Sequence, residues 1–387
     1  MSPNIDAEFI HRILVRLVQT NSINPLLDPE SPGEGEVARF IAATLNEIGL
    51  ESQTSEPEPG RVSVIGTLRG AGGGRSLMLN AHIDTVGVDG MTDPFSATID
   101  EGRLFGRGSF DMKGAMAACL GAVKGLVDGG ISLAGDVVVA GVADEEYSSI
   151  GTADVIERCK VDGAIVTEPT HLDLCLAHKG YVWLKVTTHG RAAHGSRFEE
   201  GVDANMRMGR FLGELEKLER ALRQGAAHPL VGPPSLHAAV LRGGTGVSTY
   251  AASCELHIER RTIPGETPEQ VHDEIQEIID RLRRDDPEFE ASLESYFSRE
   301  PFEVAPDAGI VRAVERGAQA VLGKIPLHVG DTPWMDAALL AAAGVETVVI
   351  GPSGAGAHAA EEWVDVESVV KLAGILAEAA IEYCGRV

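Results

Sequence analysis

Histidines and carboxylates follow short apolar runs at several places in this 387-residue chain. Such runs precede the segments His82-Ile83-Asp84, Asp144-Glu145-Glu146, Thr167-Glu168 and, beyond Gly351-Pro352, His358. A further carboxylate, Asp111, lies in a glycine-bracketed turn, Gly106–Gly114, that precedes a helical pattern. Imidazole nitrogens and carboxylate oxygens are ligands that zinc and related divalent ions take in hydrolases. The set predicts metal-assisted hydrolysis if the fold brings its members together.

The spacing within these segments permits distinct chemical roles, each with a simpler alternative. His82 and Asp84 share a face of an extended chain, so Asp84 can accept one imidazole N–H while the other nitrogen faces a metal. Glu145 and Glu146 diverge, so one can bind metal and the other act as a base, or both belong to an ordinary acidic loop. Asp111 can bridge two cations about 3.5–4 Å apart, or it caps a helix. Only the combination of segments favours a metal site.

The elements that must position these residues alternate between helices and strands. Helical patterns cover 4–20, 35–48, 112–127, 307–322, 335–343 and 365–383, and short apolar β runs cover 62–67, 76–80, 136–142, 163–166 and 345–350. This alternation predicts an α/β fold whose middle strands are buried on both faces. Ligands of open α/β sheets bind outside the carboxyl ends of the strands. Glu168 and His358, which singly could be surface residues, are therefore expected in one crevice with the others.

The middle of the chain has a different pattern. Strands are predicted at 181–188, 236–242, 252–260 and 290–298, with helices at 201–223 and 267–284. The order β-α-β-β-α-β is the ferredoxin-like α+β arrangement. We therefore expect an inserted domain at 180–299 and a catalytic domain in two parts, 1–179 and 300–387.

The amino-acid composition disfavours several classes of binding partner. The chain has 33 basic and 58 acidic residues, a net charge of -25, which disfavours binding to nucleic acid. Its five cysteines are scattered and form no C-x-x-C pair, so neither a disulfide framework nor a thiolate zinc site is expected. No apolar run has the length to span a membrane, and the N-terminus has no apolar signal core. A cytoplasmic protein without a membrane partner is predicted.

Six segments together resemble a known family. They are Asn80-Ala-His82-Ile-Asp84-Thr-Val, Gly106-Arg-Gly-Ser-Phe-Asp111-Met-Lys-Gly, Asp144-Glu145-Glu146, Thr167-Glu168-Pro169-Thr170, His189-Gly-Arg-Ala-Ala-His194-Gly-Ser196 and Ala357-His358-Ala-Ala-Glu361-Glu362. In this order they resemble the acetylornithine deacetylase / succinyl-diaminopimelate desuccinylase / carboxypeptidase G family over nearly the whole chain. The resemblance implies a zinc-aminopeptidase-like catalytic domain, with a mixed central sheet flanked by helices, and an inserted lid and dimerisation domain.

The resemblance also implies two zinc ions, for which cobalt or manganese can substitute, and a role for each matching residue. The implied metal ligands are Asp111 as the bridge, His82 and Glu168 for one ion, and Glu146 and His358 for the other. Glu145 is the implied general base and Asp84 orients His82. His194, from the lid of a partner subunit in a homodimer, would polarise the scissile carbonyl. Arg261 matches the arginine that holds the substrate carboxylate, a suitable task for a bidentate guanidinium.

The expected activity is hydrolysis of the amide bond of a small N-acyl amino acid, as in acetylornithine deacetylase or succinyl-diaminopimelate desuccinylase. Thr20–Pro25 and the Thr-Glu-Pro-Thr run favour this side of the family over a dipeptidase or carboxypeptidase. The chain departs from the family pattern at Ser248–Ala252, where many members have N-x-x-P-D, and at Glu259, where aspartate is usual. A non-catalytic homologue is a remote alternative because every ligand and the base are present. A dehydrogenase is disfavoured because Gly70–Gly74 does not form a G-x-G-x-x-G motif.

Overall fold

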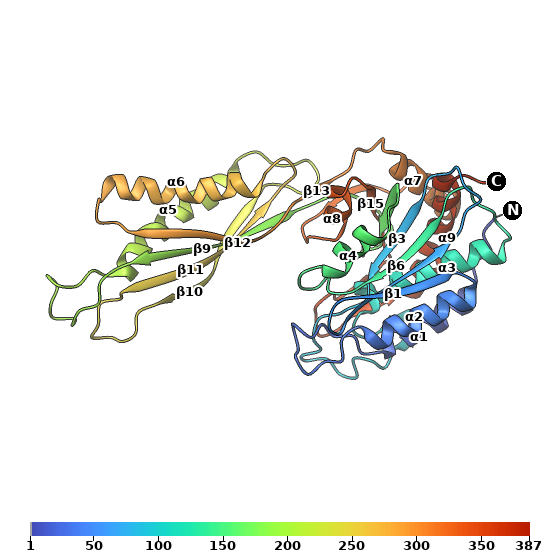
Figure 1. Ribbon diagram of the computed structural model, residues 1–387, viewed down its shortest axis with the longest axis horizontal. Coiled ribbons are helices and arrows are strands. Elements are labelled where there is room, and N and C mark those ends of the chain that lie inside the picture. Colours follow the sequence, from blue (N-terminus) through green and yellow to red (C-terminus); the bar gives the residue numbers. More distant parts are fainter. Residues whose placement is uncertain (1) are drawn as a thin grey trace. The chain divides into compact units, whose positions relative to one another are not determined.

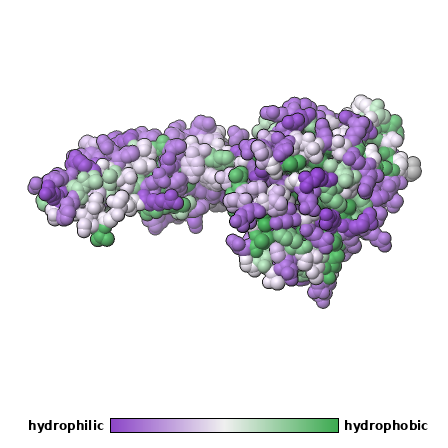
Figure 2. Space-filling view, turned by 60° about the horizontal axis from the view of Figure 1, so that its bottom comes forward, coloured by the Kyte–Doolittle hydropathy of each residue, from purple (hydrophilic) through white to green (hydrophobic). Residues whose placement is uncertain are grey.

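The computed structural model describes residues 2–387, which fall into two compact units (Figure 1). The first comprises the chain up to Leu176, Val304–Val329 and Met335–Val387, and the second comprises Ala177–Glu303 with Gly330–Trp334. Hydrophilic side chains dominate the face of each unit seen in Figure 2, as the acidic composition suggests. Among residues 2–387, no helix combines the length and apolar character needed to cross a membrane.

A nine-stranded mixed sheet organises the first unit. Its order is β1 (Glu51–Glu58), β2 (Arg61–Leu68), β6 (Val137–Val142), β3 (Leu77–His82), β7 (Gly163–Val166), β15 (Glu346–Val349), β8 (Leu174–His178) and β13 (Phe302–Glu303), with β14 (His328–Asp331) also beside β8. The pairs β6–β3, β3–β7 and β7–β15 are parallel, whereas the outer pairs are antiparallel. Every residue of β3, β6 and β7 is buried, as expected for strands covered on both faces.

Two groups of helices cover this sheet (Figure 1). One group contains α1 (Ala7–Gln19), α2 (Gly35–Ile48), α3 (Gly114–Asp128), α7 (Gly309–Leu322) and α9 (Val366–Cys384), and the other contains α4 (Ile150–Arg158) and α8 (Ala337–Ala342). The small residues of α3 allow close packing. A Cβ at Gly121 would lie 2.5 Å from Cγ1 of Ile10, so glycine permits α1 to approach α3.

A second, four-stranded sheet joins distant parts of the chain. Its order is β16 (Gly354–Ala355), β17 (Trp363–Asp365), β5 (Arg103–Phe105) and β4 (Thr98–Asp100). The β5–β17 pairing aligns Phe105 with Trp363. It therefore brings the chain that leads to Asp111 beside the loop that contains His358.

The second unit has the predicted ferredoxin-like order. It consists of β9 (Gly180–His189), α5 (Ala204–Gln224), β10 (Ser235–Gly243), β11 (Ser253–Thr262), α6 (Pro268–Asp285) and β12 (Ala291–Arg299). The sheet order is β10-β11-β9-β12, and all pairs are antiparallel. Alternate residues of β9 are buried in the core that the sheet forms with both helices. A capping box between Thr267 and Gln270 fixes the start of α6.

Several predicted boundaries were wrong. The helix predicted at 112–127 begins at Gly114, and Asp111 and Met112 have non-helical dihedral angles, so Asp111 is not a helix cap. The predicted helix at 201–223 begins at Ala204 because Asp203 caps it. Several elements were not predicted. They include β1, whose residues are polar and mostly exposed, the short helix α4, and short strands such as β4, β5, β8 and β14.

Candidate metal centre

Four residues of the centre lie at or just beyond the carboxyl ends of three neighbouring parallel strands. His82 is the last residue of β3, Glu168 lies two residues beyond the end of β7, and Glu145 and Glu146 follow β6 after a short turn. Because β6, β3 and β7 are adjacent and parallel, their carboxyl ends meet at one edge of the sheet. This is the expected ligand-binding edge of an open α/β sheet.

The Asp111 carboxylate lies between the two predicted metal-binding histidines. Its Oδ1 is 3.0 Å from Nε2 of His82, and its Oδ2 is 3.3 Å from Nε2 of His358. Each carboxylate oxygen therefore faces a different imidazole. This is the arrangement required of a carboxylate that contacts two cations at once.

The other carboxylates complete two overlapping donor sets. Glu168 Oε1 is 3.7 Å from Nε2 of His82, and Glu146 Oε2 is 3.0 Å from Nε2 of His358. Donor atoms of His82, Glu145 and Glu168 lie within 4.8 Å of one another, as do those of His82, Asp111 and Glu146. The structure thus brings together every residue predicted as a ligand, together with Glu145.

The electrostatics of this cluster fit a bound cation. Burial and then repulsion from neighbouring carboxylates raise the pKa of Glu145 well above its usual range, and burial with the nearby Asp111 raises the pKa of Glu146. Burial alone would lower the pKa of His82, but Glu168, Asp111 and Asp84 outweigh it and raise the pKa. Crowded anionic oxygens and imidazole nitrogens form a donor set that a divalent cation would stabilise.

The second nitrogen of His82 is anchored differently from the prediction. Nδ1 of His82 is 3.0 Å from the backbone carbonyl oxygen of Asp84 and 3.5 Å from its carboxylate. The carbonyl is therefore the nearer acceptor. Either acceptor favours a proton on Nδ1 and leaves Nε2 directed at Asp111.

A buried carboxylate holds the turn that carries Asp111. Glu362, 1% exposed, accepts backbone N–H groups from Gly108, Phe110 and Asp111 at 2.9–3.0 Å. It also forms an ion pair with Arg107 at 2.8 Å. Four donors on one carboxylate fix the backbone of the turn. The sequence motif contained Glu362, but no local pattern indicated this role.

Comparisons with known proteins now define the family. The model for peptidase family M20/M25/M40 matches residues 78–382, which is most of the chain. The chain belongs to this family. The predicted resemblance is thereby confirmed, and the protein is a hydrolase acting on amide bonds.

Relatives within the M20/M25/M40 family differ in their named activities. An acetylornithine deacetylase of Myxococcus xanthus is 32% identical over 332 residues, covering 84% of this chain and 85% of the relative. An N-formyl-4-amino-5-aminomethyl-2-methylpyrimidine deformylase of Bacillus subtilis is 29% identical over 409 residues, covering 96% and 95%. The crystal structure of a dinuclear metal-binding M20 peptidase of Bacillus subtilis has a TM-score of 0.74 at 17% identity, covering 99% of this chain and 100% of that one. The last likeness shows that the fold is shared.

Two predicted site residues of this M20/M25/M40 protein lie in the second unit. His194 is exposed, and its Nδ1 is 2.8 Å from the Ser196 hydroxyl. The Nε of Arg261 donates to Glu259 at 2.7 Å, and its guanidinium lies 5.1 Å from the centre of the Tyr181 ring. These contacts hold the arginine side chain in place within its own unit.

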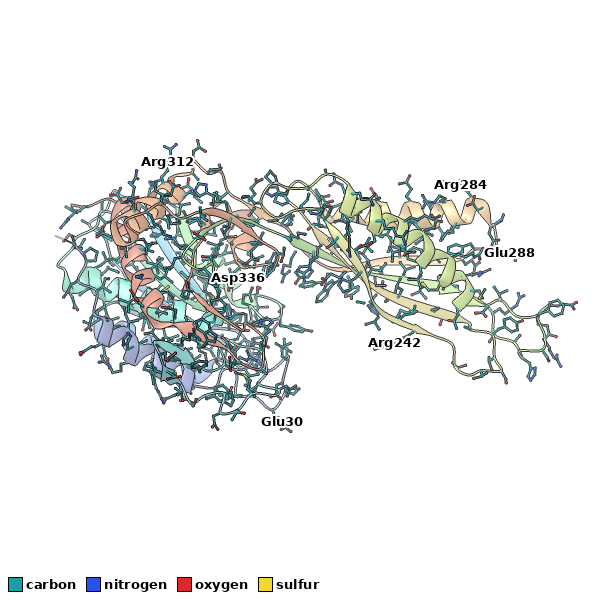
Figure 3. All side chains as sticks on the ribbon, turned by 180° about the vertical axis from the view of Figure 1, so that it is seen from behind. Glu30, Arg242, Arg284, Glu288, Arg312 and Asp336 are labelled. Atoms are coloured by element: carbon teal, nitrogen blue, oxygen red, sulfur yellow. The ribbon has the colours of Figure 1, made fainter. Side chains whose placement is uncertain are left out.

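Asp336 was missed by the sequence reasoning. It is 1% exposed in the first unit (Figure 3) and accepts a hydrogen bond from the Thr152 hydroxyl at 2.6 Å. Burial raises its pKa to about 6. Because its charge also contributes to the raised pKa values of Glu145 and Glu168, it belongs to the electrostatic surroundings of the centre. Asp336 follows no predicted strand, so no signal in the sequence singled it out.

Glu34 gives this family member a testable pH dependence. Burial, and then repulsion from Asp84, raises its pKa from 4.5 to about 7 despite its ion pair with Arg61. A carboxyl with a raised pKa binds its proton more tightly in the folded state, so stability falls as pH rises from about 4.5 through about 7. At about 1.4 kcal/mol per pKa unit, this group lowers the free energy of unfolding by up to about 3 kcal/mol over that window. Glu34→Gln removes this dependence.

The measurement is chemical unfolding of chelator-treated protein at pH 5 and pH 8. As the pH rises from 5 to 8, we expect the free energy of unfolding of Glu34→Gln to increase relative to that of the wild type. Glu36→Gln is the matched control, since the Glu36 side chain is 58% exposed on the same helix, and its difference from wild type should not change with pH. Equal differences for both variants would contradict the burial argument.

Proposed function

We propose that this protein is a dinuclear-metal hydrolase, with zinc as the resident metal, that removes the acyl group from a small N-acyl amino acid. The observation that supports it most directly is Asp111, whose two oxygens face two different histidines. His82, Glu168, Asp111, Glu146 and His358 would hold the ions. The two sequence relatives described above are a deacetylase and a deformylase, and both names denote removal of an acyl group.

The residues of this chain divide the chemical work. Two bound cations would supply Lewis acidity, which lowers the pKa of a water and polarises a carbonyl. Glu145 accepts the proton of the attacking water and delivers it to the departing amine nitrogen. Asp84 fixes the ring of His82 so that Nε2 faces the site.

His194 and Arg261 would recognise the substrate from the lid of a homodimer. Arg261 uses Nε for Glu259, which leaves its terminal nitrogens in a fixed orientation that suits a carboxylate. His194, contributed by the partner subunit, would donate to the scissile carbonyl. Strand β10 supports dimerisation because it is an edge strand with exposed Val240, Leu241 and Arg242, the last of which points away from the sheet in Figure 3.

A substrate panel on zinc-loaded protein tests this function. We expect kcat/KM for acetylornithine, succinyl-diaminopimelate or another N-acyl amino acid to exceed that for dipeptides by at least about tenfold, a difference of roughly 1.4 kcal/mol in the barrier. The reverse preference would favour the dipeptidase or carboxypeptidase alternative. No hydrolysis by protein shown to contain metal would favour a non-catalytic homologue.

Arg261→Ala is expected to weaken the binding of substrates that carry a carboxylate, and to leave other substrates unaffected. Loss of a charged hydrogen bond costs roughly 1.5–3 kcal/mol, so kcat/KM should fall about 10- to 100-fold, mainly through KM. The control is the same substrate with its α-carboxylate converted to an amide, on which wild type and variant should act alike. Equal losses on both substrates would remove Arg261 from carboxylate recognition.

A further inference from the structure

An N-terminal segment lies beside the loop that follows strand β3. The backbone N–H of Asn24 donates to the Thr85 carbonyl at 2.9 Å, and that of Thr85 donates to the Ser22 carbonyl at 3.1 Å. The Ser22 hydroxyl adds a bond of 2.7 Å to the Ile83 carbonyl. These bonds fix the backbone of Asn24 against the residues that follow His82.

The amide of Asn24 is fully engaged and has no exposed surface. Its Nδ2 donates to Oδ2 of Asp84 at 2.9 Å and to Oδ1 of Asp144 at 3.0 Å. Its Oδ1 accepts from Nη1 of Arg61 at 2.8 Å and from the backbone N–H of Leu26 at 3.0 Å. The two sides of the amide therefore cannot be exchanged without breaking these bonds.

Both carboxylates that Asn24 contacts hold the loop that carries Glu145 and Glu146. The backbone N–H groups of Glu145 and Glu146 donate to the two oxygens of Asp84 at 3.1 and 3.2 Å. Asp144 precedes them with a positive φ of 68° and accepts the Ser148 hydroxyl at 2.5 Å. Asp84 and Asp144 thus set the course of the loop through the metal centre.

The charges in this region favour a hydrogen-bond donor at the position of the Asn24 amide. Asp84 and Asp144 are both fully buried, and two carboxylates repel each other strongly where water is excluded. Arg61 lies 2.9 Å from Asp144, but it is shared with the buried Glu34. The Asn24 NH2 group is the hydrogen-bond donor that lies between the two carboxylates and satisfies both.

We propose that Asn24 is a positioning residue whose NH2 group, held by Arg61, fixes the Asp84 and Asp144 carboxylates and thereby presents Glu145 and Glu146 at the metal centre. Its effect on turnover rests on the proposed function, because that function assigns Glu145 as the base. Its effect on metal binding does not, because the placement of Glu146 beside His358 and Asp111 is a property of the structure.

Asn24→Asp is the test, since it keeps the side-chain volume and replaces the shared donor with a carboxylate oxygen. We expect kcat to fall about 100-fold with KM within about threefold, and zinc affinity, measured by competition with a chromogenic chelator, to fall about 10- to 100-fold, the usual range for outer-shell partners. Circular dichroism should show a folded chain. A lower unfolding temperature with kcat per folded molecule and zinc affinity unchanged would overturn the proposal.

Asn21→Asp is the matched control in the same segment. Within residues 2–387, the Asn21 side chain makes its hydrogen bond through Oδ1, which accepts the backbone N–H of Ile23 at 3.0 Å, and aspartate retains that acceptor. This variant should match wild type in both kcat and zinc affinity, and a loss equal to that of Asn24→Asp would overturn the proposal.

If Asn24→Asp does not fold, Asn24→Ser, which keeps one donor, should show smaller losses of kcat and zinc affinity. A wild-type protein that hydrolyses no N-acyl amino acid would refute the proposed function, while zinc affinity would still test Asn24.

Discussion

Glu145→Gln is expected to abolish most turnover while leaving metal binding intact. Glutamine has the same shape as glutamate but cannot accept the proton of the attacking water. General base catalysis contributes about 10²- to 10⁴-fold, so kcat should fall by a factor in this range. KM should change little because the side chain is not assigned to substrate binding. The measurements are kcat on the best substrate of the panel and the zinc content of the purified variant.

The neighbouring residue supplies the control for this prediction. Glu146 contacts His358 at 3.0 Å and is a predicted metal ligand, so Glu146→Gln should be purified with less zinc than the wild type. Glu145 also lies within reach of His82 and Glu168 as a possible metal donor. If Glu145→Gln loses zinc as Glu146→Gln does, then Glu145 is a ligand and the base assignment is wrong.

Asp111→Asn should have a comparable effect through metal binding. An asparagine offers one neutral oxygen where Asp111 offers two anionic ones, each facing a different histidine. We expect the loss of one zinc equivalent and a fall in kcat of about 1,000-fold. Such a fall corresponds to about 4 kcal/mol, which is within the several kcal/mol that metal ions contribute to transition states.

Metal analysis and titration calorimetry check this prediction. Asp128→Asn is the control because Asp128 lies at the far end of α3 and pairs with the half-buried Lys124. It should retain two zinc equivalents and full turnover. An Asp111→Asn protein that also binds two equivalents with wild-type affinity would show that Asp111 does not bridge two ions.

The sequence predicts the strand ends of this centre well because the signal there is local. An apolar run followed by a carboxylate or histidine marks the carboxyl end of a buried strand, and β3, β6 and β7 place His82, Glu145 and Glu168 accordingly. The order of strands and helices in the second unit was also predictable, because β9 alternates between buried and partly exposed residues, as expected for a half-buried strand.

The supporting contacts were not predictable because they join residues far apart in the chain. Glu362 and Asp111 are 251 positions apart, and Asn24 and Asp144 are 120 apart. No local sequence pattern around a buried asparagine or glutamate indicates which residue it will contact. The contacts are determined only when the sheet brings the two segments together. The local sequence around Asp111 allowed either a metal bridge or a helix cap, and the contact with Glu362, which holds Asp111 in an irregular turn, could not be predicted from it.

The pairing of β5 with β17 has a consequence for biosynthesis. The predicted metal ligands and Glu145 come from residues 82 to 168 and from residue 358, and the strands that join these two parts end at residue 365. A ribosome must therefore translate the whole second unit before the final histidine can meet the others. Until then the cluster lacks one of its two histidines, so the complete metal site proposed above would form only after the second unit has been synthesised.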